Sequence, residues 1–358
     1  MTSDDNTFHN MQNCNFCKTV LMLIIVFYHA GMFWTGDWFT AIRPAQTSQP
    51  ISIAVHWMGT FHVYAFTLIS GYIYYYIRFQ RGGYEEIGKF IINKTKRLVV
   101  PYIFIATLWV IPLSNIFFHL NCIQIVKSYT LGESPSQLWF LLMLFWVFII
   151  AYPLSKYFRS NPISSASVVI GCWLLGIAGN AVLPNILQIF TALQFIPYFW
   201  IGFEIRRWQT ESTTSKNMIF NPLIGAAELI LNIIFFLLSE YNAFEGLIGT
   251  AIGISASFAS RICGALMAFN FLMLLACRIQ WHTRFFIALS NASYPIYLFH
   301  QQIIYFILWQ LNGHLPPFIL MLASFIIATI TSWMISYAIT SIPIFRPLIG
   351  LRFNIREG

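Results

Sequence analysis

Charged residues are scarce in this sequence: only 9% of its 358 residues are Asp, Glu, Lys or Arg, whereas 58% are apolar. A soluble domain of this length could not bury so much apolar surface, so most of the chain is expected to face lipid. The apolar runs are about 20 residues long and continuous rather than alternating, which disfavours a β-barrel and favours membrane-spanning helices.

Cysteines are also few, and their spacing does not predict a metal site. Cys14 and Cys17 form one C-x-x-C pair, but a zinc site needs two further ligands at suitable spacing, and none is near. The other four cysteines lie in or beside apolar runs and are interpreted as small packing residues. No secretory signal is evident, because Asp4 and Asp5 stand where a basic cluster would be expected.

What the sequence has in abundance is apolar stretches, and ten of them predict an all-α polytopic transmembrane helical bundle. The four longest are expected to be tilted or broken. The expected spans are residues 18–35, 52–78, 98–118, 137–155, 163–181, 186–205, 220–239, 247–277, 285–311 and 317–343. We therefore expect one transmembrane domain over residues 18–345, between an N-terminal segment, 1–17, and a C-terminal tail, 346–358.

Lysine and arginine residues gather on one side of the expected membrane. Seventeen of the 20 lie in the segments on the side of the N-terminus, and only Arg43 and Lys127 lie in the opposite loops. The positive-inside rule therefore predicts that both termini are cytoplasmic. The same rule accounts for the net charge of +8, so nucleic acid is not an expected partner.

The remaining basic residue, Arg261, lies near the middle of the eighth expected span. An arginine at a helix centre costs about 2.5–3.5 kcal/mol on insertion scales, so it needs a partner or a wet cavity. Glu228 in the seventh span is the obvious candidate partner. Two interpretations stay open: a buried ion pair that joins two helices, or a positive charge that faces a substrate.

Three histidines fall inside expected spans at similar depth. His29 follows Lys18 by eleven residues, which is close to three helical turns, so the two share one helix face about 16 Å apart. His62 and His300 lie in the second and ninth spans, also in the middle or outer part of the bilayer. A lone intramembrane histidine is most often a hydrogen-bonding core residue, but three at one depth indicate a polar cavity. Imidazole is well suited to proton transfer near neutral pH.

A basic run stands at the start of the third span. Lys94 and Arg97 are one helical turn apart and are expected to share a face. Such residues are common as positive-inside anchors. They would also suit a phosphate-binding site at the cytoplasmic surface, because both side chains bind phosphate well.

The pair Lys18 and His29, with Ala-Gly after the histidine, resembles the basic-x10-His signature of the acyltransferase 3 family of integral-membrane O-acyltransferases. Further segments resemble that family's motifs in the same order. They are residues 61–71, Lys94-x-x-Arg97-Leu98 with Pro101, 138–141, 196–199 with Gly202, and 291–300. Each motif is weak alone, but their common order and spacing over residues 14–343 make the set specific.

The sequence departs from the family pattern at a few positions. The family more often has Arg where Lys18 and Lys94 stand, and often Asp where Asn15 stands. Lysine keeps the positive charge but lacks the planar fork with which arginine binds phosphate in a bidentate manner.

The resemblance implies an O-acetyltransferase that moves an acyl group, in the first instance acetyl from acetyl-coenzyme A, to a hydroxyl of a surface polysaccharide or lipid-linked sugar. It implies no tightly bound cofactor, a place in the bacterial inner membrane, and polysaccharide biosynthesis of the O-antigen kind. The donor's nucleotide end would bind Lys18, Lys94 and Arg97 at the cytoplasmic surface.

The resemblance also implies roles for the residues deeper in the bundle. His29 would act as the general base on the acceptor hydroxyl, or would carry the acyl group briefly itself. His62 would assist it as a second catalytic histidine. Arg261, Tyr294 and His300 would contact the substrate or stabilise the oxyanion.

Two other functions remain open from the residues. Intramembrane His, Arg and Glu would also suit proton-coupled export of a polysaccharide unit or small molecule, although no matched pair of halves is apparent. A non-catalytic subunit of a glycan assembly complex is the third. Consumption of a thioester by the purified protein separates the enzyme from both.

Overall fold

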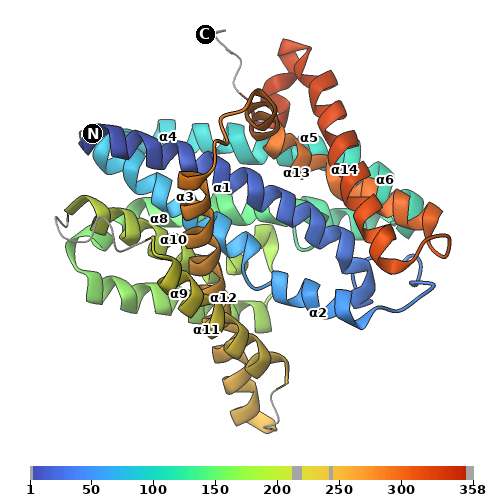
Figure 1. Cartoon of the computed structure of the whole chain (residues 1–358), viewed down its shortest axis with the longest axis horizontal. Coiled ribbons are helices and arrows are strands. Elements are labelled where there is room, and N and C mark those ends of the chain that lie inside the picture. Colours follow the sequence, from blue (N-terminus) through green and yellow to red (C-terminus); the bar gives the residue numbers. More distant parts are fainter. Residues whose placement is uncertain (1–2, 212–219, 242–244, 352–358) are drawn as a thin grey trace. The chain divides into compact units, whose positions relative to one another are not determined.

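The structure is a computed structural model that describes residues 3–211, 220–241 and 245–351. Within these ranges the chain forms helices and no strands, which confirms the all-α prediction (Figure 1). The α-helices are α1 (Ser3–Gly31), α2 (Gln49–Met58), α3 (His62–Tyr75), α4 (Ile87–Lys94), α5 (Val100–Ile105), α6 (Ile111–Phe118), α7 (Cys122–Ile125), α8 (Trp139–Ser160), α9 (Pro162–Val182), α10 (Ile189–Glu211), α11 (Pro222–Glu240), α12 (Gly246–Arg278), α13 (Arg284–Leu311) and α14 (Pro317–Thr340). Shorter 3₁₀ or π-helical turns are η1 (Met32–Thr35), η2 (Tyr76–Gln80), η3 (Thr95–Val99), η4 (Ala106–Val110), η5 (Val126–Thr130), η6 (Ser136–Leu138), η7 (Ile186–Gln188) and η8 (Pro343–Ile349).

Eight helical stretches of the described chain are long and apolar enough to cross a membrane, which identifies an integral membrane protein. They are Met11–Thr35, Ile87–Phe118, Ser136–Arg159, Ile163–Val182, Ile186–Glu211, Pro222–Glu240, Gly246–Arg278 and Pro317–Thr340. These correspond to eight of the ten expected spans. The count of ten and the cytoplasmic position of the termini stay predictions. Of the expected C-terminal tail, 346–358, the part after Leu351 lies outside the described residues.

The other two expected spans are not among these long apolar helices, and the reason is different for each. The span expected over 52–78 is interrupted after Met58, where α2 ends, and resumes at His62, where α3 begins. The residues between the two helices, 59–61, are called the α2–α3 break below. The span expected over 285–311 is one helix of 28 residues, α13, but its polar side chains, among them His300, Gln301 and Gln302, lower its hydropathy.

Helix α1 begins well before the first expected span. It starts at Ser3, and the apolar stretch within it begins at Met11, so Lys18 lies inside the helix rather than at its start. The segment expected at 1–17 is therefore helical from Ser3 onward. The reason is local: residues 3–17 contain neither proline nor glycine, so nothing there terminates a helix.

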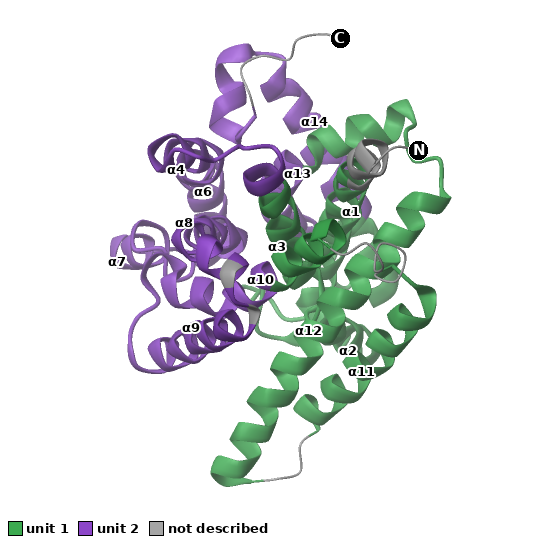
Figure 2. Cartoon of the chain, turned by 90° about the vertical axis from the view of Figure 1, so that its left-hand side faces the viewer, with its two compact units in different colours: residues 1–76, 201–293, 311–325 green, residues 77–200, 294–310, 326–358 purple. Residues whose placement is uncertain are grey.

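The chain divides into two compact units, shown in different colours in Figure 2. Unit 1 comprises Met1–Tyr76, Ile201–Ser293 and Leu311–Phe325. Unit 2 comprises Ile77–Trp200, Tyr294–Gln310 and Ile326–Gly358. Each unit is described by itself below.

In unit 1, α1, α3 and α12 pack against one another, and α11 lies beside α12 along much of its length (Figure 1). The buried face of α12 is rich in small residues such as Gly249, Ala256, Ser260 and Gly264, which allow neighbouring helices to approach closely. Near the start of the unit 1 part of α10, Gly202 approaches α3 so closely that a Cβ atom there would overlap the carbonyl oxygen of Leu68.

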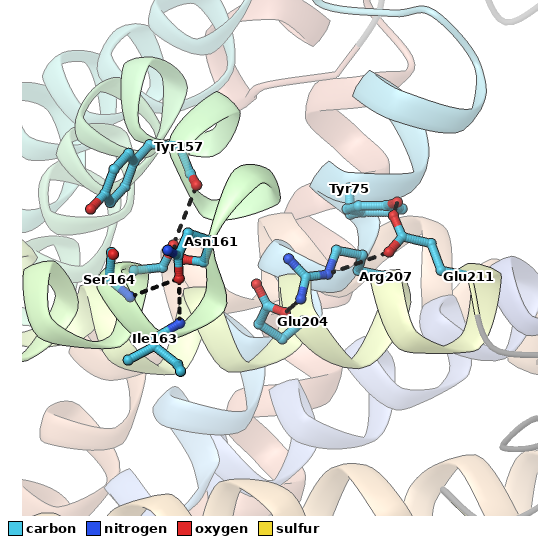
Figure 3. A network of polar contacts seen from close by, with 9 residues as sticks. Tyr75, Tyr157, Asn161, Ile163, Ser164, Glu204, Arg207 and Glu211 are labelled. Atoms are coloured by element: carbon cyan, nitrogen blue, oxygen red, sulfur yellow. Dashed lines mark hydrogen bonds and ion pairs between the residues drawn. The ribbon is translucent and has the colours of Figure 1, made fainter.

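The unit 1 part of α10 also carries a buried ion pair (Figure 3). The Arg207 guanidinium lies 2.8 Å from the Glu204 carboxylate, and their side chains are only 6% and 14% exposed. The Glu211 carboxylate lies 3.8 Å from the Nε atom of Arg207 and accepts a hydrogen bond from the Tyr75 hydroxyl at 3.3 Å. Little-exposed charges need such partners, because an unpaired charge in an apolar environment is costly.

In unit 2, α8 packs against α4, η3 and α9. Helix α9 follows α8 after Asn161 alone, and its first residue is Pro162. The side-chain oxygen of Asn161 accepts hydrogen bonds from the backbone amides of Ile163 at 3.1 Å and Ser164 at 3.2 Å (Figure 3). An asparagine cap followed by proline is a favoured helix start, so local sequence explains this sharp turn.

Candidate functional site

Lys18 and His29 lie on one continuous helix, α1, eleven residues apart. Three helical turns, about 16 Å along the axis, separate them, so the two residues lie on one face of this helix, as the spacing predicted. Both side chains are half-buried. The basic-x10-His pair is therefore placed by a single rigid element.

His29 lies among aromatic rings. Its imidazole is nearly parallel to the indole ring of Trp38, with 5.5 Å between ring centroids and an interplanar angle of 9°. The ring of Tyr28 lies 5.3 Å from His29 and 4.3 Å from His62. Tyr28 thus contacts both histidines, and unit 1 brings together two of the three histidines that the sequence singled out.

His62 is the first residue of α3 and is buried, with 4% of its surface exposed. Its Nδ1 atom lies 2.7 Å from the carbonyl oxygen of Met58. A carbonyl oxygen only accepts hydrogen bonds, so Nδ1 must carry the proton and donate. In the neutral ring the other nitrogen, Nε2, then keeps its lone pair and can accept a proton.

Arg261 does not form the ion pair with Glu228 that the sequence suggested. In the described part of the chain its guanidinium lies over the ring of Tyr64, with Cζ 5.3 Å from the ring centroid. Glu228 instead accepts a hydrogen bond from the side chain of Asn270 at 3.3 Å. The reason is register: Asn270 is nine residues beyond Arg261 on α12, about 14 Å along the helix axis.

Ser260, the residue before Arg261 on α12, is hydrogen-bonded to Asn232 of α11. Asn232 is fully buried and donates to the backbone oxygen of Ser260 at 2.8 Å and to the hydroxyl of Thr60 at 3.0 Å. Its side-chain oxygen accepts from the indole of Trp57 at 2.8 Å. Sequence reasoning missed this group, although an asparagine inside an apolar span is a signal for an interhelical hydrogen bond.

The loop that carries Trp38 is attached to the rest of unit 1 by Asn312. The Asn312 side chain accepts a hydrogen bond from the amide of Ala45 at 2.9 Å and donates to the carbonyl of Arg43 at 2.8 Å. The indole of Trp34 donates to the carbonyl of Gln46 at 3.1 Å. Trp38 and Asn312 were also missed, because loop residues carry no helical periodicity that would mark them.

In unit 2, Lys94 lies in an aromatic environment. Its ammonium group is 3.4 Å from the ring centroid of Phe148 and 5.0 Å from that of Tyr84. Arg97, in contrast, is exposed. The two residues are separated by the start of η3, a π-helical turn that is wider than an α-helical one. They therefore have different surroundings, although the sequence placed them on one face.

The backbone of Arg97 is tied to α13. The hydroxyl of Tyr294 donates to the Arg97 carbonyl at 2.9 Å, and a Cβ atom at Gly350 would lie 2.5 Å from the Tyr294 ring. Tyr294 therefore supports the backbone of the basic run, and its predicted contact with the substrate or oxyanion stays a prediction.

His300 is fully buried in α13. Its Nδ1 atom lies 2.7 Å from the carbonyl of Tyr297, so this ring also carries its proton on Nδ1. Close by, Gln137 donates to the Leu298 carbonyl at 3.0 Å and to the side chain of Gln302 at 2.9 Å. His300 thus belongs to a buried polar group of unit 2, whereas His29, His62 and Arg261 belong to unit 1.

The described residues contain no group of three or more His, Cys, Asp or Glu side chains that could hold a metal ion. In a comparison with protein families, the family model described as an acyltransferase domain, of the acyltransferase 3 type, matches residues 12–337. No curated protein and no solved structure matches the chain.

Proposed function

This membrane chain belongs to the acyltransferase 3 family, and we propose that it is an O-acyltransferase that moves an acetyl group from cytoplasmic acetyl-coenzyme A to a sugar hydroxyl. The acceptor in this proposal is a surface polysaccharide or a lipid-linked sugar, and the membrane is the bacterial inner membrane. The observation that carries the proposal is that the Tyr28 ring contacts both His29 and His62. Tyr28 and His29 lie on α1, the helix that also carries Lys18.

In this proposal His29 is the base, and His62 assists it as the second catalytic histidine, with its Nε2 atom as a proton acceptor. In the proposed step the imidazole of His29 removes the proton of the acceptor hydroxyl, and the hydroxyl oxygen attacks the thioester carbonyl carbon. The C–S bond then breaks, and the leaving thiolate takes the proton from the imidazolium of His29. The products are the acetyl ester and free coenzyme A, so no further reactant is required.

Two neighbours support this role for His29. The parallel indole of Trp38 and the ring of Tyr28 restrict the orientation of the imidazole, which keeps the base in place for the attack. We assign stabilisation of the oxyanion to the guanidinium of Arg261, which lies over the ring of Tyr64 in unit 1.

The phosphates of the donor are assigned to basic residues on the proposed cytoplasmic side. Arg97 is exposed and can form bidentate hydrogen bonds with phosphate. Lys94, also in unit 2, would join it by leaving the ring of Phe148. In unit 1, Lys18 is proposed as a cation for the donor on the helix that carries His29. In unit 2, His300 and Tyr294 are kept as residues that contact the substrate.

The test is thioester consumption by the purified protein in detergent with the surface glycan as acceptor, together with mass spectrometry of the surface glycan from cells. His29→Ala should abolish both thioester consumption and glycan acetylation. The matched control is His56→Ala, because His56 is an exposed histidine of α2 and has no place in the proposed mechanism. An inserted His29→Ala protein that still acetylates the glycan would overturn the assignment, and wild-type protein that consumes no thioester would favour a transporter.

A further inference from the structure

The α2–α3 break creates the hydrogen bond that orients His62. In a continuous α-helix the backbone amide of His62 would bond to the carbonyl of Met58, four residues earlier. At the break the chain makes tighter turns, in which the amide of Thr60 bonds to Trp57 at 2.9 Å and that of Phe61 to Met58 at 3.2 Å. The Met58 carbonyl is thereby available to the His62 ring, which approaches it at 2.7 Å.

The break is in turn bonded to Asn232. The Thr60 hydroxyl donates to the Trp57 carbonyl at 2.7 Å and accepts from the Asn232 amide at 3.0 Å. The Asn232 oxygen accepts from the Trp57 indole at 2.8 Å. One amide side chain thus bonds to residues on both sides of Met58, the residue whose carbonyl the imidazole uses.

Burial makes the hydrogen bonds of this amide costly to lose. Asn232 is fully buried, so an unbonded amide there would be costly, and its remaining contacts are to Ser260 on α12. On α12, a Cβ atom at Gly264 would lie 2.7 Å from the Asn232 nitrogen and 3.0 Å from the Thr60 carbonyl oxygen. The break, α11 and α12 therefore meet at a point where only a glycine fits.

We propose that Asn232 is a positioning residue for His62: by stabilising the α2–α3 break, it keeps the imidazole bonded to Met58 through Nδ1, so that Nε2 is left as the proton acceptor. Without Asn232 the turn is free to relax toward a regular helix, in which the amide of His62 competes for the Met58 carbonyl. The imidazole then loses the bond that fixes its tautomer and its orientation. The catalytic consequence rests on the proposed function, but the tautomer does not.

A matched control exists on the same pair of helices. Asn270 is also buried on α12. Its side chain donates to the backbone oxygen of Asn221, the residue before α11, at 3.2 Å and to the carboxylate of Glu228 on α11 at 3.3 Å. It joins α11 and α12 as Asn232 does, but it makes no bond to the break. Asn232→Leu and Asn270→Leu therefore remove similar amides, and only the first affects the residues next to His62.

The first experiment reads the tautomer directly. Nitrogen NMR of histidine-labelled protein in detergent distinguishes a ring protonated at Nδ1 from one protonated at Nε2, and the His62 signals are identified by their absence in His62→Gln. We expect the Nδ1-protonated pattern in the wild type and in Asn270→Leu, and its loss or averaging in Asn232→Leu. An unchanged His62 pattern in Asn232→Leu, or an equal change in Asn270→Leu, overturns the inference.

Thr60→Val provides the same test if Asn232→Leu does not fold. It removes the one hydroxyl through which the Asn232 amide reaches the break, with little change in side-chain shape. The His62 pattern should change in this variant as well. A folded Thr60→Val protein with the wild-type pattern would overturn the inference.

The second experiment measures thioester consumption by the same variants with the surface glycan as acceptor. Asn232→Leu should lower kcat roughly 100-fold with little change in KM for the donor, whereas Asn270→Leu should stay within about twofold. Absence of turnover in the wild type would overturn the proposed function and leave the tautomer result standing. Normal turnover in Asn232→Leu with a changed tautomer would overturn the catalytic part of the inference alone.

Discussion

The guanidinium of Arg261 lies over the ring of Tyr64, with Cζ 5.3 Å from the ring centroid, and not against the carboxylate of Glu228. Tyr64 follows His62 by two residues on α3, and Arg261 lies on α12, which packs against α3. The positive charge near the middle of α12 is thus held against an aromatic ring and not against an acidic partner.

The first prediction follows from this contact. Glu228→Gln should change the free energy of unfolding by less than about 1 kcal/mol, because no ion pair is lost. If the carboxylate did neutralise Arg261, its removal would leave a buried charge unpaired, at a cost of about 3–5 kcal/mol. Thermal unfolding of the purified protein in detergent measures the difference, and Tyr64→Leu, which removes the ring, should be the more damaging substitution.

A second prediction concerns the close approach of α10 to α3. Gly202→Ala should strongly reduce the yield of folded protein, because its Cβ atom would overlap the Leu68 carbonyl, and relief of such overpacking costs about 1–3 kcal/mol or more. Gly171→Ala on α9 is the control, since a Cβ atom there has nothing within 4 Å. It should be neutral or stabilising by up to about 1 kcal/mol, because alanine favours helix. Equal behaviour of the two variants in thermal unfolding would contradict the described approach.

The third prediction uses the pair of Arg207 and Glu204. Arg207→Met should destabilise the protein by about 3–5 kcal/mol, because the little-exposed Glu204 carboxylate loses the guanidinium that lies 2.8 Å from it. The double substitution Arg207→Met with Glu204→Leu should recover much of the loss. A thermal-unfolding double-mutant cycle measures the coupling.

The control for this cycle is the exposed pair of Lys89 and Glu86, also 2.8 Å apart but with side chains 79% and 63% exposed. Lys89→Met should have no measurable effect, since solvent screens exposed pairs. If the two pairs were equally sensitive, or the double substitution were no better than the single one, burial would not be what makes Arg207 important.

The fourth prediction tests the loop that carries Trp38. Asn312→Ala removes the hydrogen bonds to the Ala45 amide and the Arg43 carbonyl, so peptides over residues 39–48 should take up deuterium faster. Peptides over residues 119–136, whose backbone is bonded to Tyr102 and Gln188 of unit 2, should be unaffected. Hydrogen exchange with mass spectrometry measures both regions, and unchanged uptake at 39–48 would show that other contacts hold the loop.

Much of the fold could be predicted from the sequence, because membrane insertion and helix formation depend on residues that are close together in the chain. Eight of the ten expected spans correspond to long apolar helices, and the spacing of Lys18 and His29 predicted their shared helix. The ordered motifs likewise indicated the family that the chain matches over residues 12–337. Where the span boundaries differ, as at the start of α1, the composition of the flanking residues explains the difference.

The partners of the polar residues were decided only by tertiary structure. Asn232 and Thr60 are 172 residues apart, and Arg261 meets Tyr64 rather than Glu228. Such pairings depend on the register of one helix against another and on where a small residue such as Gly264 lets the helices approach, and neither is a property of any single stretch. Hydropathy and spacing therefore determined that this chain crosses a membrane and carries an acyltransferase signature, whereas packing decided which side chains surround its histidines.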